Sequence, residues 1–164
     1  GNVILMSDIT KEIGADALRF VFLTKKSDTH LEFDLDILTN QDSTNPTFYI
    51  NYAYARINQL FKKAELTFDN VKDVEFKNLN EDSLNLLYEA LLLPAILDEG
   101  FTKRDMQKIT DYLHGLAASV HKFYNEHRII DTKEQNESLK MLSMVALSIR
   151  TGLGLLGIKA KEVM

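Results

Sequence analysis

The fold is decided by the stretch KRDMQKITDYLHGLAASVHKFYNE, which is residues 103–126. Its apolar residues recur at steps of three and four, the period of an amphipathic helix with one buried face. They are Met106, Ile109, Leu113, Leu116, Ala117, Val120, Phe123 and Tyr124. The stretch therefore predicts a long helix that packs against other helices.

Three further stretches have the same helical pattern. They are 46–65, which starts at Pro46; 83–100, which Pro94 interrupts; and 133–156. Proline is well suited to the first turn of a helix, whereas inside a helix it breaks the hydrogen-bond ladder. Residues 67–82 are acidic and irregular, and predict a long connection. Together these stretches predict an all-α fold, an antiparallel helical bundle.

The beginning of the chain has shorter elements. Residues 3–6 are apolar and predict a strand or an extended entry segment. Ser7 or Asp8 is expected to cap a short helix, and Gly14 is expected to end it. A second helix is predicted over 15–25.

Residues 31–36, LEFDLD, alternate apolar and acidic side chains, which predicts a short strand. The following residues, 40–46, are polar and rich in turn formers. We therefore expect a short mixed connector over 1–40 and a helical domain over 41–164.

Composition limits the class of protein. The chain has 164 residues, 45% of them hydrophobic, which is enough for a core. Without cysteine, disulfides and thiolate metal sites are excluded, as suits a cytoplasmic protein. No apolar run is long enough for a membrane helix. The net charge of −5 disfavours nucleic-acid binding by phosphate neutralisation alone, so any RNA site must be a local surface.

Catalytic and metal-binding patterns are weak. The late glycines Gly152, Gly154 and Gly157 follow a helix, so helix packing or termination explains them better than a nucleotide loop. His114 and His121 share a helix face, but their spacing is wider than zinc sites use, and we expect solvated or rim histidines. A small enzyme built in a bundle would need convergent titratable residues, and the sequence shows none. We expect no catalytic residue and no metal site.

Aromatic residues give a stronger signal. Tyr49 and Tyr52 lie on adjacent turns of one predicted helix, with Arg56 one turn further. Such a set can stack unpaired bases without much positive charge. The alternative is ordinary packing, with the tyrosine hydroxyls at the rim of the core and Arg56 in a bracing salt bridge.

Five blocks follow one another along the chain: GADALRFVFLT at 14–24, LEFDLD at 31–36, NPTFYINYAYARI at 45–57, DYLHGLAASVHKFY at 111–124 and GLGLLGIKAKEVM at 152–164. In this order they resemble bacterial arginyl-tRNA synthetases. The first contains the DALR string that names the anticodon-binding domain of certain class I synthetases. The third resembles the family's Asn-Pro-x-x-Tyr-x-x-Tyr-Ala-x-Ala-Arg motif. The HIGH-type and KMSK-type signatures of the catalytic domain are absent from this sequence.

The resemblance implies a C-terminal fragment that binds the anticodon loop of tRNA-Arg and cannot activate arginine itself. ATP and magnesium would belong to the full-length arginine–tRNA ligase, with no cofactor in this fragment. Carried over position by position, the base-receiving residues are Tyr49, Tyr52, Tyr124 and Met164, with Arg56 as a further candidate. We expect neither DNA nor a membrane as partner, and a monomer.

Two other points depend on this resemblance. Many relatives have a proline and an arginine near the terminal methionine; here the tail lacks both, and Lys159 and Lys161 are the alternatives for phosphate contacts. Asp16 and Arg19 of the DALR string are expected to cap or pair within the connector.

The open alternatives are a helical protein-interaction adaptor that uses the leucine-rich stretch 83–98, and the anticodon-binding domain of another class I synthetase.

Overall fold

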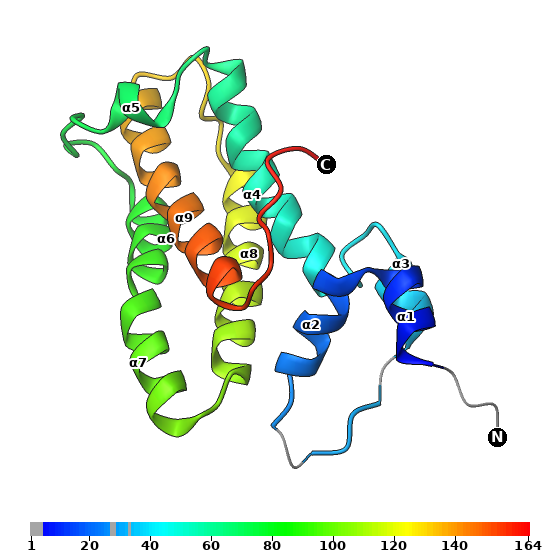
Figure 1. The fold of residues 1–164 in the computed structure, drawn as a ribbon. Helices are drawn as coiled ribbons and strands as arrows, with labels where there is room; N and C mark the ends of the chain where they lie inside the picture. The colour runs from blue at the N-terminus through cyan, green and yellow to red at the C-terminus, as the bar shows by residue number, and fades with distance from the viewer. Residues whose placement is uncertain (1–4, 27–28, 33) are drawn as a thin grey trace.

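The computed structural model describes residues 5–26, 29–32 and 34–164, and every regular element in these ranges is a helix (Figure 1). The helices are α1 Met6–Ile13, α2 Ala15–Leu23, α3 Leu35–Thr39, α4 Pro46–Lys63, α5 Phe68–Val71, α6 Glu81–Leu91, α7 Leu93–Lys103, α8 Gln107–Glu126 and α9 Gln135–Leu155. The prediction of an all-α bundle is confirmed. No helix in these ranges is both long enough and apolar enough to cross a bilayer.

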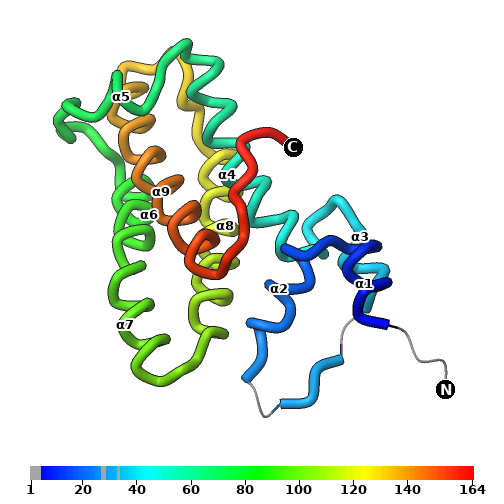
Figure 2. The backbone as a smooth tube through the Cα atoms, in the orientation of Figure 1, coloured from blue at the N-terminus to red at the C-terminus, as the bar shows by residue number. Residues whose placement is uncertain are grey.

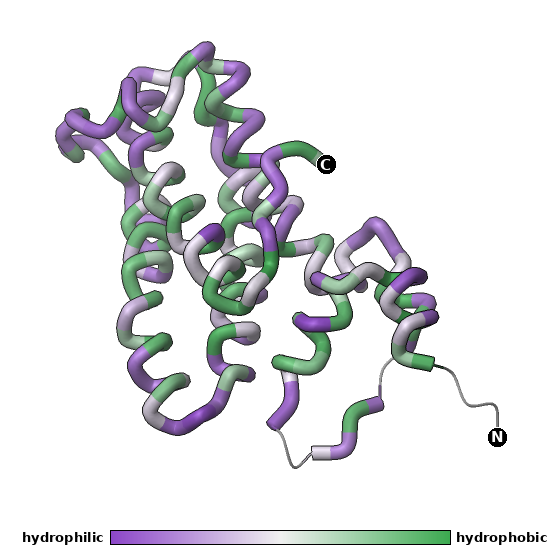
Figure 3. The backbone as a smooth tube through the Cα atoms, viewed as in Figure 1, coloured by the Kyte–Doolittle hydropathy of each residue, from purple (hydrophilic) through white to green (hydrophobic). Residues whose placement is uncertain are grey.

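The bundle core lies between α4, α6, α8 and α9, which contact one another. Hydrophobic and hydrophilic residues alternate along these helices (Figure 3), and the predicted apolar face of α8 is buried from Ile109 to Phe123. On α9, Leu139, Val145 and Ile149 have no exposed surface. The helical period in the sequence therefore identified the core-facing sides correctly.

Pro94 acts as predicted, because α6 ends at Leu91 and α7 begins at Leu93. The proline lies in the first turn of α7, where its missing N–H leaves no hydrogen bond unmade. The predicted connection over 67–82 contains the short helix α5 and is otherwise irregular as far as Asn80, because α6 begins at Glu81.

Helix α4 is capped by Asn45, whose side-chain amide makes four hydrogen bonds. The side-chain oxygen of Asn45 accepts hydrogen bonds from the backbone N–H groups of Thr47 and Phe48, both at 3.1 Å. Its side-chain nitrogen donates to the carbonyls of Leu38 and Asn40, at 2.8 and 3.0 Å. Asn45 therefore caps α4 and fixes the preceding loop against it.

Two predictions about the connector are wrong. Helix α1 begins at Met6 with Leu5 before it and no side-chain cap, so Ser7 and Asp8 lie inside the helix. The described residues of 31–36 form no strand, because the carboxylate of Asp34 accepts from the N–H of Asp36 and begins helix α3. No neighbouring strand is present in the described ranges to pair with this segment. Of the 3–6 prediction, residues 3 and 4 lie outside the described residues, Leu5 precedes helix α1 and Met6 begins it, so the extended segment does not reach Met6.

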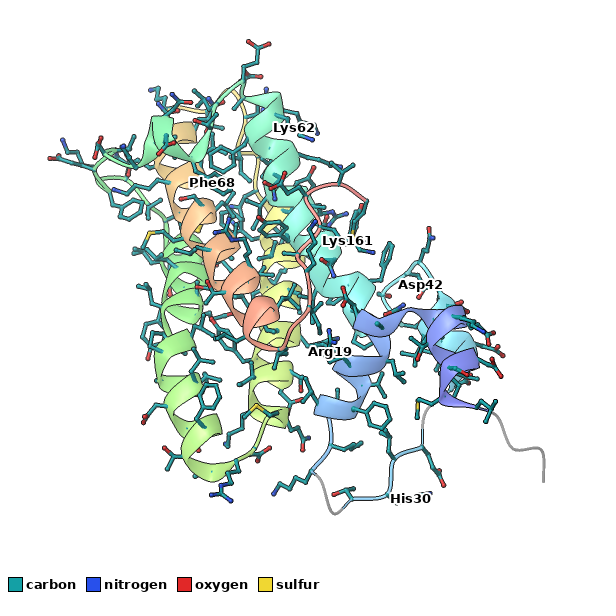
Figure 4. The ribbon with its side chains drawn as sticks, in the orientation of Figure 1. Arg19, His30, Asp42, Lys62, Phe68 and Lys161 are labelled. Carbon is teal, nitrogen blue, oxygen red and sulfur yellow. The ribbon has the colours of Figure 1, made fainter. Side chains whose placement is uncertain are left out.

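Gly14 ends α1 as predicted, with a φ of 84° that suits glycine. The second helix, α2, carries Phe20 into the bundle core, where the side chain is 1% exposed. Arg19 pairs with Asp16 at 3.6 Å, as expected, and also donates a hydrogen bond to the carbonyl of Gly157 after α9 (Figure 4). The connector is thus attached to the bundle; its boundary near residue 40 stays a prediction.

Candidate nucleic-acid interface

A column of flat side chains lies along α4. Residues four apart share a helix face, so Phe48, Tyr52 and Arg56 follow one another along the helix. The rings of Phe48 and Tyr52 are stacked, with centroids 5.9 Å apart. The guanidinium carbon of Arg56 lies 4.5 Å from the Tyr52 ring centre and 4.7 Å from that of Tyr124 on α8. Arg56 therefore bridges the aromatic residues of the two helices by cation–π contacts.

His121 of α8 holds this column from the side. Its Nδ1 lies 3.1 Å from a guanidinium nitrogen of Arg56, and its Nε2 lies 3.1 Å from the backbone oxygen of Tyr49. The imidazole also packs on the rings of Tyr49, at 4.4 Å, and Tyr52, at 5.5 Å. The predicted site residues Tyr49, Tyr52, Arg56 and Tyr124 are thus brought together in one cluster.

The cluster is partly open to solvent. Tyr49, Tyr52 and Tyr124 are half-buried, whereas Tyr54 on the opposite side of α4 is 2% exposed. In the described part of the chain, no hydrogen bond is found for the three cluster hydroxyls, and none of them is a buried atom without a partner. The hydroxyls therefore reach solvent, unlike that of Tyr112, which lies 3.0 Å from two backbone carbonyls. The rings are neither sealed inside nor fully exposed.

Two hollows flank the column. One, of about 570 Å³, is lined by Phe48, Asn51 and Met164 together with residues of α1, α2 and the loop before α4. The other, of about 280 Å³, is lined by Tyr124, with Lys63 and Arg128 beside it. Each end of the column therefore faces a hollow that is open to solvent.

The C-terminal tail, residues 158–164, runs back along α4 (Figure 2). Its position is fixed by Asn51, whose side-chain oxygen accepts a hydrogen bond from the backbone N–H of Lys161 at 2.8 Å (Lys161 is labelled in Figure 4). Met164 is 40% exposed and lines the larger hollow with Phe48, and the side chain of Lys159 is also exposed. Met164 thus lies next to the column's Phe48 end and apart from the clustered tyrosines.

Sequence reasoning missed three residues of this surface. Phe48 precedes the tyrosines and was absent from the candidate set, although its spacing of four from Tyr52 was a usable signal. Asn51 was missed because the sequence around a buried polar residue in a helix does not show which distant group it will hydrogen-bond. The prediction of a solvated or rim histidine is wrong for His121, which is 7% exposed; His114 is exposed.

The bracing salt bridge considered for Arg56 is replaced by ring contacts. In residues 5–26, 29–32 and 34–164, Arg56 forms no ion pair, and its charge is balanced by the faces of Tyr52 and Tyr124 and by His121. Burial lowers the pKa of His121, and the charge of Arg56 lowers it further, whereas the hydrogen bond to Tyr49 acts in the opposite direction. The described residues contain no group of three or more histidines or carboxylates that could hold a metal ion.

The adaptor alternative depends on α6. This helix directs Leu86 and Ala90 into the core and leaves Leu84, Tyr88 and Leu91 exposed. An exposed apolar stripe of this kind is compatible with a protein partner but has no feature that selects one.

Comparison with known proteins adds the deciding observation. A family model described as the DALR anticodon binding domain matches residues 50–164. The chain belongs to this family. The chain is 70% identical over all of its 164 residues to an arginine–tRNA ligase of Aliarcobacter butzleri, and it covers 31% of that relative. An arginine–tRNA ligase of Nitratiruptor is 55% identical over the same span and is also covered to 31%, so the chain spans about a third of the length of these relatives.

Solved structures agree with the fold of the DALR domain. A crystal structure assigned as an arginyl-tRNA synthetase of Campylobacter jejuni matches all of this chain and 36% of its own, with a TM-score of 0.95 and 54% identity. An arginyl-tRNA synthetase of Thermus thermophilus matches 99% of this chain and 28% of its own, with a TM-score of 0.75 and 22% identity. At that lower identity the second match supports the fold alone.

Proposed function

We propose that this DALR domain binds the anticodon loop of tRNA-Arg as part of an arginine–tRNA ligase. The observation that carries the proposal is the half-exposed column of Phe48, Tyr52, Arg56 and Tyr124, with Tyr49 and the tail beside it. Single-stranded RNA loops are recognised by stacking their bases on aromatic and guanidinium planes.

Stacking explains how an acidic chain can bind RNA. Each base stacked on an aromatic ring contributes about 1–3 kcal/mol, and this contribution does not require a large positive field. Lys63 and Arg128 near Tyr124, and Lys159 and Lys161 on the tail, are positioned for a few phosphate contacts. Local cations at both ends of the column therefore suit a short loop better than a long duplex.

The whole enzyme's activity is part of the same proposal. We propose that the full-length protein joins arginine to tRNA-Arg with ATP and Mg²⁺ in the cytoplasm, and that anticodon binding helps to place the acceptor end of the tRNA. We place the proposed ATP site in the part of such an enzyme that this chain does not cover, since the chain spans 31% of its Aliarcobacter relative. We expect the chain to act as a monomer on RNA, with neither DNA nor a membrane as partner.

A fluorescence-anisotropy titration with a labelled anticodon stem-loop of tRNA-Arg tests the proposal, with a stem-loop of another tRNA for comparison. Tyr49→Ala and Tyr124→Ala should each weaken binding by about 5- to 150-fold, the equivalent of one lost stacking partner. Tyr88→Ala is the matched control, since Tyr88 is 65% exposed on α6 and outside the cluster. Equal binding of both stem-loops, or equal loss in all three variants, would refute the proposal.

A further inference from the structure

His121 is an unusual residue for the inner side of an RNA-binding surface. It is 7% exposed, and both ring nitrogens have a partner on α4. It also contacts the rings of Tyr49 and Tyr52. His121 therefore touches three members of the proposed interface from behind without facing the solvent itself.

The two partners fix the protonation of the ring. An arginine side chain has only donors, so Nδ1 of His121 must accept from Arg56 through its lone pair. The backbone oxygen of Tyr49 only accepts, so Nε2 must carry the hydrogen. The arrangement is satisfied by one species alone, the neutral imidazole protonated on Nε2.

We propose that neutral His121 is a positioning residue that keeps Arg56 between Tyr52 and Tyr124, and that it thereby makes RNA binding by this surface sensitive to pH. The inference rests on the proposed function. When the guanidinium of Arg56 is held in contact with the rings of Tyr52 and Tyr124, it keeps those rings at a fixed spacing before RNA binds. Such preorganisation increases the affinity for RNA because less conformational freedom is lost on binding.

The surroundings determine the direction of the pH effect. From α4, His121 faces the cation Arg56 and the phenols Tyr49 and Tyr52; from α8, exposed His114 lies on the ring of Tyr49, at 5.2 Å. No carboxylate pairs with His121 in the described part of the chain. A proton on Nδ1 would remove the acceptor for Arg56 and place two cations 3.1 Å apart. The position of Arg56 against Tyr52 and Tyr124 is therefore stable when the imidazole of His121 is neutral.

The sign of the effect follows from linkage. Burial lowers the pKa of His121 in the folded domain, so the unfolded chain takes up the proton first. The contribution of the neutral ring to stability is complete above the ordinary histidine value of about 6.5 and is lost as the pH falls below it. RNA affinity should decrease at lower pH than this, because Arg56 is released only when the folded His121, whose pKa is lowered, takes up the proton.

Two amide variants separate positioning from packing. In His121→Asn the side-chain oxygen replaces Nδ1 as acceptor for Arg56, whereas in His121→Gln the amide reaches the Nε2 position next to the Tyr49 carbonyl. With the same labelled anticodon stem-loop at pH 7.5, we expect His121→Asn to bind within about twofold of wild type. His121→Gln should bind at least about fivefold more weakly, the loss of one hydrogen bond of about 1 kcal/mol.

The pH profile gives the second readout. As the pH falls from 7.5 to 4.5 the wild-type chain should lose RNA affinity, and His121→Asn should remove that loss. His30→Asn, the same substitution at an exposed histidine in the connector loop (Figure 4), should keep the wild-type profile. The unfolding midpoint of each variant is measured alongside. If either amide variant does not fold, the question is decided by the wild-type and His30→Asn profiles together with the NMR signal of the Arg56 guanidinium between pH 7.5 and 4.5.

The outcomes are distinct. If the wild-type chain does not bind the stem-loop, the proposed function fails and this inference fails with it. If the wild type binds, but the two amide variants bind equally or the pH profile of His121→Asn matches that of the wild type, only the inference is overturned. Likewise, a wild-type affinity that is constant from pH 7.5 to 4.5 overturns the inference alone.

Discussion

Replacing Gly152 by alanine should destabilise the bundle, although alanine is the better helix former. A Cβ at Gly152 would lie 2.7 Å from Cδ2 of Leu113 and 3.3 Å from two further atoms of that side chain, whereas ordinary contacts begin near 3.4 Å. Leu113 has no exposed surface, so it cannot move aside into solvent. Overpacking of this kind costs about 1–3 kcal/mol. The gain in helix propensity, up to about 1 kcal/mol, offsets only part of it.

Gly154→Ala is the matched control. Gly154 lies in the same helix, and a Cβ there meets nothing within 4 Å. The propensity gain is common to both variants, so the difference in their free energies of unfolding isolates the contact with Leu113. We expect Gly152→Ala to be less stable than Gly154→Ala by about 1–3 kcal/mol in urea unfolding. In a thermal scan this is about 2–4 °C for each kcal/mol. Equal stabilisation by both substitutions would show that α8 and α9 are not in close contact there.

Three further predictions concern hydrogen bonds. Tyr112→Phe removes a hydroxyl that is hydrogen-bonded to α6, and it should lower the free energy of unfolding in urea by about 1 kcal/mol. Because burial raises the pKa of Tyr112 to about 12, the wild type should also lose stability as the pH rises from 10 towards 12. An identical loss in the variant would contradict this assignment. Asn51→Leu releases the tail, so carboxypeptidase should remove Met164 about fivefold faster by mass spectrometry, and an unchanged rate would count against the tail anchor. Hydrogen bonds from the backbone N–H groups of Asn78 and the preceding residue lower the pKa of Glu137, so the stability that they contribute should be lost as the pH falls below the carboxyl's usual 4.5. In Glu137→Gln, the unfolding midpoint should therefore change less between pH 6 and pH 3 than in the wild type. Parallel curves for the two proteins would contradict the assignment.

The bundle could be predicted because its helices are defined by local patterns. Pro46 and Pro94 fall in first turns, and the apolar spacing of α8 matches its buried face. The late glycines also behave as expected: Gly152 allows close packing on Leu113, and Gly157 follows α9 with a φ of 72°. In each case the information lies within a few residues of the feature, so the sequence alone is sufficient.

The connector and the inner side of the site could not be predicted in this way. The alternation in 31–36 is typical of a strand, but an aspartate that caps its own segment favours a helix, and a strand also needs a partner. The burial of His121 depends on how α4 crosses α8, which no local pattern records. Arg56 likewise has its contacts on a residue 68 positions away, Tyr124, and on His121.

Asn45 has a consequence for the angular setting of the whole ring surface. An α-helix turns by about 100° for each residue, so a start shifted by a single position would rotate every later side chain by that amount. Because all the hydrogen-bonding positions of Asn45 are occupied at the first turn, the helix cannot begin one residue earlier or later without leaving several of them empty. The direction in which the side chains of Tyr49, Tyr52 and Arg56 point is therefore set by the side-chain amide of Asn45 at the start of the helix.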